Sequence, residues 1–166
     1  MKESEIHKFI TSDDFKSREA FVADFDDDLK ELSLTFSEAF NYLENSPCNQ
    51  DSSTRASTVS GYIFLAIESA VTATQLLSLG HIAPAGNSMR ISYESLCYSA
   101  LLKKEIKLQV SNGKHKFYFY SDYLKKSPHT RADKVIDVVV KNKDVLGLSD
   151  DGVKFLVGAE NFYNGY

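Results

Sequence analysis

Apolar side chains recur every third or fourth residue along the first third of the chain. Between Asp14 and Glu44 this spacing continues over three heptads, which predicts one helix about 45 Å long with a narrow apolar stripe. Such a stripe needs another helix to cover it, so we expect packing in a helical bundle and favour it over an isolated coiled coil. The stripe comprises Val22, Phe25, Leu29, Leu32, Phe36, Ala39 and Leu43, and Phe21, Leu34 and Phe40 are expected to widen the buried face.

Two further helices follow, joined by a tight turn. Residues 56–79 are apolar on two faces and rich in small side chains that let a neighbour approach closely, so this helix belongs at the centre of the bundle. Gly80 suits the residue just after a helix, and Pro84 suits the first turn of the next one. The short joint therefore predicts an antiparallel hairpin. The small residues are Gly61, Ala66, Ala70 and Ala73, and the next helix is expected to present Met89, Tyr93, Leu96, Cys97, Ala100 and Leu101 inward.

Residues 106–120 carry two conflicting signals. They alternate between apolar and polar residues around Asn112-Gly113, which is typical of a β-hairpin. The aromatic residues that begin at Phe117 can instead start a helix that covers one end of the bundle. We expect a loop followed by that helix, with a short hairpin or an irregular segment as the alternative.

Two more helices are expected beyond this segment. Thr130 caps the first, which runs to about Asp144, and Ser149 starts the second, which runs to the C-terminus. A chain of 166 residues is long enough for one sizeable core. The sequence therefore predicts an all-α fold, a bundle of four to five long helices in a single domain over residues 1–166, with residues 1–12 as a loose N-terminal arm.

Composition narrows the class of protein and its compartment. Hydrophobic residues make up 43% and charged residues 25%, which is ordinary for a globular protein. Cys48 and Cys97 form neither a disulfide framework nor a zinc-site spacing, so we interpret both as plain thiols in a reducing cytoplasm. The first residues lack the apolar core of a secretory signal, and the apolar span 62–80 carries Glu68 and Gln75, as buried helices do and membrane spans rarely do.

Charge is unevenly distributed along the chain. Residues 1–50 hold 5 basic and 12 acidic side chains, whereas residues 101–146 hold 11 basic and 5 acidic ones. These two parts can pack side by side within one chain or pair across a homodimer. The net charge of −4 argues against a general nucleic-acid binder, so contact with RNA phosphates is the weaker alternative for the basic part. The basic strip in question comprises Lys114, Lys116, Lys125, Lys126, Arg131 and Lys134.

One polar cluster stands out as a candidate site. Arg90 and Glu94 are four residues apart on the third helix and share a face, while Glu68 lies in the most apolar helix. Counted from Gly80, Glu68 and Arg90 are offset by roughly 7 Å along the hairpin, within reach of an arginine side chain. Because a buried carboxylate needs a partner, we expect a Glu68–Arg90–Glu94 network. It either fixes the register of the two helices, which we favour, or holds an anionic ligand.

Tyr93 and His81 complete the set of candidate ligand-binding residues. Tyr93 adjoins the face of Arg90 and can supply a hydroxyl, as can Tyr62. His81 lies in the joint two turns before Arg90, and a catalytic role for it is a minor alternative. The sequence shows no Ser-His-Asp set, no Gly-rich phosphate loop and no metal-ligand spacing, so we expect neither a metal nor a cofactor and assign no catalytic residue.

The segment from Leu76 to Glu94, LLSLGHIAPAGNSMRISYE, resembles a pattern in uncharacterised bacterial all-helical proteins. In that pattern a helix ends in Gly, and an Arg with a Glu four residues later opens the next helix. Those proteins are distantly similar to the HEPN superfamily, helical bundles that often dimerise and act in RNA cleavage, toxin–antitoxin pairs or phage defence. The resemblance implies Arg90 and Glu94 as site residues.

Nuclease chemistry does not follow from this resemblance. The HEPN nuclease pattern places a His four to six residues after the Arg, and no Arg of this chain is followed by a His at that spacing. Without the His, a general acid or base is lost. The chain is therefore either a non-catalytic member, which we favour, or a nuclease whose His lies elsewhere.

We therefore expect a cytoplasmic bacterial module that self-associates or binds a protein partner and has no enzymatic activity. Two alternatives stay open. One is an RNase or a nucleotide-acting enzyme centred on Arg90 and Glu94. The other is a sensor that binds a small anion or metabolite in a pocket at Arg90.

Overall fold

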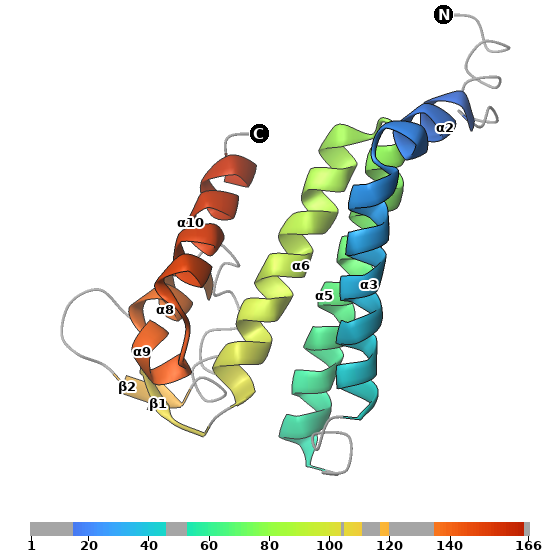
Figure 1. Cartoon of the computed structure of the whole chain (residues 1–166). Coiled ribbons are helices and arrows are strands. Elements are labelled where there is room, and N and C mark those ends of the chain that lie inside the picture. The colour runs from blue at the N-terminus through green and yellow to red at the C-terminus, as the bar shows by residue number, and fades with distance from the viewer. Residues whose placement is uncertain (1–14, 46–52, 104, 111–116, 120–134, 165–166) are drawn as a thin grey trace, which may run out of the picture.

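The computed structural model describes residues 15–45, 53–103, 105–110, 117–119 and 135–164. Seven helices dominate these residues, and the predicted all-α fold is confirmed. Figure 1 shows α3, α5 and α6 side by side, with α10 along α6 and α2 at the end where α5 and α6 join. The elements are α2 (Phe15–Asp24), α3 (Asp26–Glu44), α5 (Thr54–Ser78), α6 (Ile82–Lys103), β1 (Lys107–Gln109), β2 (Phe117–Phe119), α8 (Val135–Lys141), α9 (Lys143–Leu146) and α10 (Asp150–Asn164).

The α5–α6 hairpin follows the prediction closely. Ser53 caps α5, because its hydroxyl accepts a hydrogen bond from the Ala56 amide at 3.2 Å. After α5, Gly80 adopts φ +77°, and the amides of Gly80 and His81 return to the carbonyls of Leu77 and Leu76, each at 2.9 Å. This pair of bonds is the Schellman motif that ends a helix and reverses the chain.

Small buried side chains allow the two helices of this hairpin to pack closely. Gly61 and Leu96 do not follow the prediction, because both are exposed. By length and composition alone α5 could cross a membrane, a property that core helices of soluble proteins share. The small buried residues are Ala56, Ala66, Ser69, Ala70, Ala73 and Ser78 of α5 and Ala85, Ser92, Ser95 and Ser99 of α6.

The predicted single helix over residues 14–44 is wrong, because the chain bends at Phe25 and forms α2 and α3 (Figure 1). Phe25 leaves helical geometry at φ −121° and ψ 24°, and the three aspartates 26–28 then open α3. Aspartate is a poor residue for a helix interior and a favourable one for a first turn, where it faces the positive end of the helix dipole. The acidic run therefore begins a new helix.

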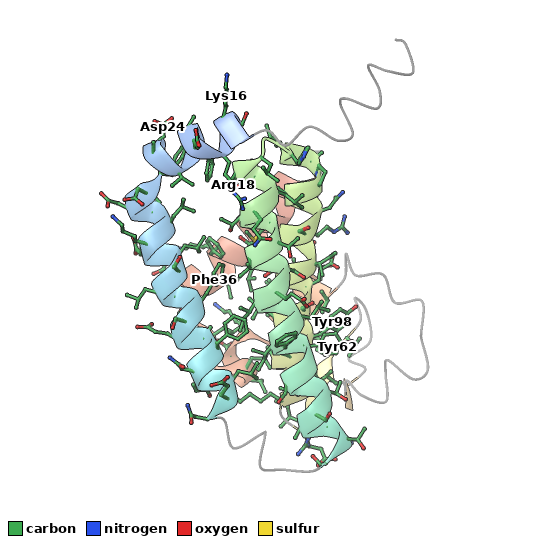
Figure 2. The ribbon with its side chains drawn as sticks, turned by 90° about the vertical axis from the view of Figure 1, so that its right-hand side faces the viewer. Lys16, Arg18, Asp24, Phe36, Tyr62 and Tyr98 are labelled. Carbon is green, nitrogen blue, oxygen red and sulfur yellow. The ribbon has the colours of Figure 1, made fainter. Side chains whose placement is uncertain are left out.

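The apolar stripe of this region is less covered than its spacing predicts. Leu43 is the one α3 residue that is buried, and the Phe40 ring meets Phe64 of α5 edge-on at 6.2 Å. Leu34 is 61% exposed and does not widen the buried face. Figure 2 shows Phe36 of α3 on the side toward α5.

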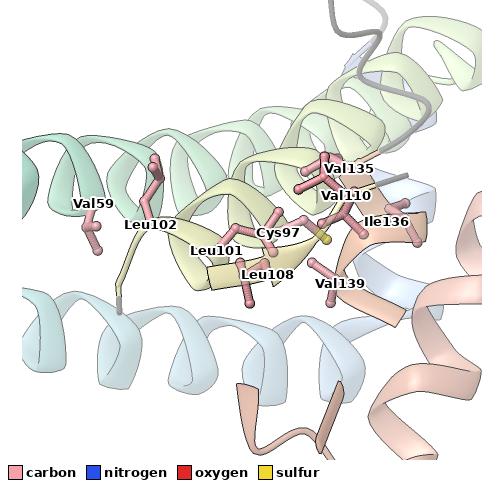
Figure 3. Close-up of a cluster of buried hydrophobic side chains, with 10 residues drawn as sticks. Val59, Cys97, Leu101, Leu102, Leu108, Val110, Val135, Ile136 and Val139 are labelled. Atoms are coloured by element: carbon pink, nitrogen blue, oxygen red, sulfur yellow. The ribbon is translucent and has the colours of Figure 1, made fainter. Parts of the chain in front are cut away.

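The hydrophobic core lies between α6, β1 and α8. Four of its side chains are fully buried: Leu101, Leu108, Val135 and Val139. Figure 3 shows them gathered with Cys97 and Ile136, and Val59 of α5 at one end of the cluster. The residues after Lys103 therefore supply six of the ten side chains of this cluster, although their elements are short.

A two-stranded antiparallel sheet replaces the helix expected at Phe117. Strands β1 and β2 pair Lys107 with Phe119 and Gln109 with Phe117, so the hairpin alternative is confirmed for these six residues. In β1, Leu108 points into the core, while its neighbour Lys107 is exposed, as the alternation of a strand predicts.

The expected helix up to Asp144 is interrupted at Asn142, which separates α8 from α9. The start of α10 agrees with the prediction, since the Ser149 hydroxyl accepts a hydrogen bond from the Gly152 amide at 3.1 Å. Two predictions, the N-terminal arm 1–12 and the Thr130 cap, lie outside the described residues.

Candidate functional site

Arg90 and Glu94 form the ion pair that their spacing predicts. The guanidinium Nε of Arg90 donates to Oε1 of Glu94 at 2.8 Å, one helical turn away. The Glu94 side chain is 15% exposed, whereas the Arg90 side chain is 42% exposed. The carboxylate thus lies inside the protein and the cation at its surface. A guanidinium has five N–H donors, and the partial exposure of the Arg90 side chain lets an anion from solvent approach it.

The pair lies on the side of α6 that faces α10. Tyr93, between the two residues, meets Phe155 of α10 edge-on, with ring centroids 5.9 Å apart and planes at 77°. One turn beyond Glu94, Cys97 is buried in the core. The carboxylate of Glu160 in α10 is close enough to Cys97 to raise the pKa of its thiol. One carboxylate from each helix, Glu94 of α6 and Glu160 of α10, therefore acts electrostatically on this thiol.

The thiol of Cys97 is held in its protonated form. Burial raises its pKa to about 12, and the carboxylates of Glu160 and Glu94 contribute in the same direction. A reactive cysteine needs a lowered pKa and access to solvent, and Cys97 has neither. The interpretation of Cys97 as a plain thiol agrees with these properties, while Cys48 lies outside the described residues.

The predicted network does not include Glu68. This residue is exposed, and it forms no ion pair with any described residue, Arg90 included. The buried residues Ala66, Ala70 and Ala73 mark the face of α5 that meets α6. At about 100° per residue, Glu68 is rotated by roughly 200° from Ala66 and points away from that face. The predicted contact considered only the offset along the hairpin, whereas the rotation of the helix also decides which side chains meet.

His81 and Tyr62 also lie apart from the Arg90–Glu94 pair. His81 is exposed in the turn, and its nine-residue separation from Arg90 corresponds to about 13 Å along a helix. Tyr62 stacks on Tyr98 with ring centroids 5.1 Å apart (Figure 2). Tyr98 is eight residues further along α6 than Arg90. Burial, and after it the neighbouring Tyr62, raises the pKa of Tyr98. Of the five candidates, the structure brings together Arg90, Tyr93 and Glu94.

A surface hollow of about 470 Å³ lies on α2 and the start of α3, away from this cluster. Charged side chains of both signs line it around an apolar floor: Arg18, Glu19, Val22, Ala23 and Asp26. The periodic spacing predicts Val22 in the buried stripe and gives no indication of this hollow. The hollow lies beside the bend at Phe25, for which the periodic pattern carries no signal.

Asn142 is a second residue that the sequence analysis missed. Its side chain is buried and forms three hydrogen bonds, which join the end of α8 to strand β1. The sequence around Asn142 gives little indication that its side chain is buried, because Asn142 lies between two lysines, a pattern that is typical of a solvent-facing turn. Its role is to hold α8 against β1, since all three of these hydrogen bonds are to main-chain atoms.

No group of three or more metal-ligating side chains is found within the described part of the chain. The basic strip from Lys114 to Lys134 lies outside the described residues. The described cluster can bind an anion at Arg90. The ion pair with Glu94 fixes the direction in which the guanidinium points.

Comparison with known proteins finds no family, no curated protein and no solved structure that matches this chain.

Proposed function

We propose that the chain is a non-enzymatic helical module of the bacterial cytoplasm that acts through self-association as a homodimer or through binding a protein partner. As a distant HEPN-like protein, it would fit a role in phage defence or in a toxin–antitoxin pair. The alternatives are a small-anion or metabolite sensor and an RNase, both centred on Arg90.

The observation that carries the proposal is the number of large hydrophobic side chains left exposed. Soluble monomers tolerate single exposed apolar residues, whereas larger apolar surfaces mark sites of association. Every long helix of the described structure contributes at least one such residue. They are Val22, Phe25, Leu34, Tyr42, Phe64, Leu65, Leu77, Ile82, Ile91, Leu96, Val145, Phe155 and Phe162.

The chemistry of the polar cluster is consistent with a non-enzymatic role. Cys97 is protonated and buried, so it does not act as a nucleophile. Glu94 is engaged by Arg90, which disfavours its use as a general base.

Sedimentation velocity of the whole chain across a hundredfold range of concentration tests self-association. The proposal predicts that the weight-average mass rises toward twice 18.6 kDa as concentration increases. A constant mass of one chain over the whole range would contradict the homodimer, and the proposal would then depend on a different protein partner.

Binding of a small anion is the second candidate, and the 42% exposure of Arg90 is the observation that favours it. The chain offers a matched control in Arg55, which is 45% exposed and pairs with Glu105 at 3.2 Å. Thermal unfolding is measured with inorganic phosphate and with nucleotides. A rise in melting temperature that is lost in Arg90→Ala and kept in Arg55→Ala would support the sensor.

A further inference from the structure

The outer side of helix α3 combines exposed apolar residues with carboxylates. Phe36 marks the side of α3 that faces α5 (Figure 2). At about 100° per residue, four residues lie within roughly 60° of the opposite direction: Glu31, Leu34, Glu38 and Tyr42. Leu34 is 61% exposed and Tyr42 is 63% exposed, and both glutamates are exposed as well. We call these four residues the outer α3 face.

The packing of α3 in the bundle does not use this face. Helix α3 contacts α5 through its opposite side, where Phe40 meets Phe64 edge-on at 6.2 Å and Leu43 is buried. Leu34 and Tyr42, about two helical turns apart, therefore gain little burial from the described chain, although burial of such side chains is favourable. A partner that lies along α3 would bury both of them together.

Two carboxylates of the outer α3 face are available to the cations of a partner. Helix α3 contains six acidic residues and one basic residue, Lys30. The Lys30 ammonium is engaged by Asp26 and Asp27. Neither Glu31 nor Glu38 forms an ion pair with another described residue. The helix thus presents negative charge beside its exposed apolar residues.

We propose that the outer α3 face docks a basic amphipathic helix of a different protein. The inference rests on the partner-binding arm of the proposed function, and it names the surface and the chemistry of the partner. Leu34 and Tyr42 contact the apolar stripe of that helix. Its lysines or arginines pair with Glu31 and Glu38, as charged residues beside the apolar seam do in coiled coils.

The charge of α3 disfavours other kinds of partner. A second α3 helix carries the same excess of carboxylates, so two copies repel each other through this face. Nucleic-acid phosphates and anionic lipid surfaces are repelled for the same reason. A free metal ion would leave Leu34 and Tyr42 exposed, and the described residues contain no group of three metal-ligating side chains.

The length of α3 limits the strength of this docking. Its 19 residues extend over about 28 Å, so a single docked helix forms a small interface of the kind typical of transient recognition. Charge attraction speeds the encounter with a basic partner and is weakened by salt. Binding is accordingly reversible and dependent on salt concentration.

Peptide titration of the whole chain, followed by isothermal titration calorimetry, tests the docking surface. The probe is a synthetic peptide of about 20 residues built from leucine, lysine and alanine, with the leucines along one helical side and the lysines beside them. A second peptide has glutamate in place of each lysine, and a third has the composition of the first in scrambled order. We expect the lysine peptide to bind, the glutamate peptide not to bind, and the scrambled peptide to bind at least about fivefold more weakly.

Variants of the chain locate the binding on α3. Glu31→Gln combined with Glu38→Gln is expected to weaken binding of the lysine peptide by at least about fivefold, and Leu34→Ser by about tenfold. The matched control combines Asp137→Asn with Asp144→Asn, which removes the same charge from exposed positions of α8 and α9. It is expected to leave binding within about twofold, because those carboxylates lie outside α3.

The possible results separate this docking surface from self-association. Equal binding of the lysine and scrambled peptides, or unchanged binding by the double glutamine variant, would overturn the docking surface. Self-association, which sedimentation measures without peptide, would then still stand. A wild-type dimer that is lost in the double glutamine variant would assign the face to a second copy, and would overturn docking of a different protein. A chain that binds no peptide and stays monomeric at every concentration would overturn both proposals.

Discussion

The side-chain amide of Asn142 pairs with the main chain of Gln109 as a neighbouring strand would. The Gln109 amide donates to Oδ1 of Asn142 at 2.9 Å, and Nδ2 of Asn142 donates to the Gln109 carbonyl at 3.0 Å. A third bond, from Nδ2 to the Val138 carbonyl at 2.7 Å, joins this pair to α8. The buried side chain of Asn142 thus connects strand β1 to helix α8, and both of these elements contribute side chains to the core.

Asn142→Ala is expected to lower the free energy of unfolding by about 2–3 kcal/mol, because it leaves the Gln109 amide and carbonyl without these partners. Urea unfolding followed by circular dichroism measures the loss. The matched control is Asn87→Ala at an exposed position of α6, which should change stability by less than about 0.5 kcal/mol. Equal effects of the two substitutions would show that Asn142 does not hold β1 in place.

Gly80 and Gly61 should respond to alanine in opposite directions. Gly80 has φ +77°, a conformation that costs an L-residue roughly 1 kcal/mol, so Gly80→Ala is expected to lower the melting temperature. Gly61 lies within α5 with open space around it, so Gly61→Ala is expected to raise the melting temperature through helix propensity. If both variants move the melting temperature in the same direction, the described geometry of one glycine is wrong.

The thiol of Cys97 should react slowly in the folded chain. Its pKa is raised to about 12 from an ordinary value near 9, so the reactive thiolate is scarce at neutral pH. In a Cys48→Ser background, where Cys97 is the remaining cysteine, we expect alkylation by iodoacetamide to be rapid in urea and very slow without it. Rapid alkylation of the folded protein at pH 7 would contradict the burial of this residue.

The same raised pKa makes stability depend on pH in the alkaline range. Below pH 9 the thiol is protonated in both the folded and the unfolded chain, and its contribution to the free energy of unfolding is complete. Between pH 9 and about 12 the unfolded chain releases the proton first, so this contribution declines as pH rises. A Cys97→Ala variant should lack that component of the decline, which urea unfolding at pH 8 and pH 10.5 can measure.

Asp150 should titrate below its ordinary value because Lys143 hydrogen-bonds to its carboxylate. A lowered pKa means that the pair favours the folded state above the ordinary carboxyl pKa and that this contribution is lost as pH falls. Nuclear magnetic resonance titration of the carboxyl carbon measures the value. In Lys143→Ala the pKa of Asp150 should return upward, and an unchanged value would rule out the contact between α9 and α10.

Signals that act over a few residues predicted much of this fold. The α5–α6 hairpin followed from Gly80 and from the small residues of α5, and the Arg90–Glu94 pair followed from a spacing of one helical turn. Both depend on neighbours along the chain, which the sequence displays directly.

Features that depend on distant parts of the chain could not be predicted in the same way. Asn142 and Gln109 are 33 residues apart, and their contact exists only after α8 and β1 have packed together. Glu68 was assigned to the site by its depth in an apolar helix, but the rotation of α5 against α6 turns it outward. The bend at Phe25 likewise interrupts a stripe whose spacing alone indicates a continuous helix.

Native mass spectrometry of gently purified wild-type chain, beside Arg90→Ala, tests the central claim most directly. If the chain acts through self-association and not through catalysis or ligand binding, the wild type is a dimer of unmodified chains with no additional mass. Arg90→Ala then forms the same dimer. A species that carries an extra mass in the wild type and loses it in Arg90→Ala would contradict the claim. It would make Arg90 a ligand-binding residue and the protein a sensor or an enzyme.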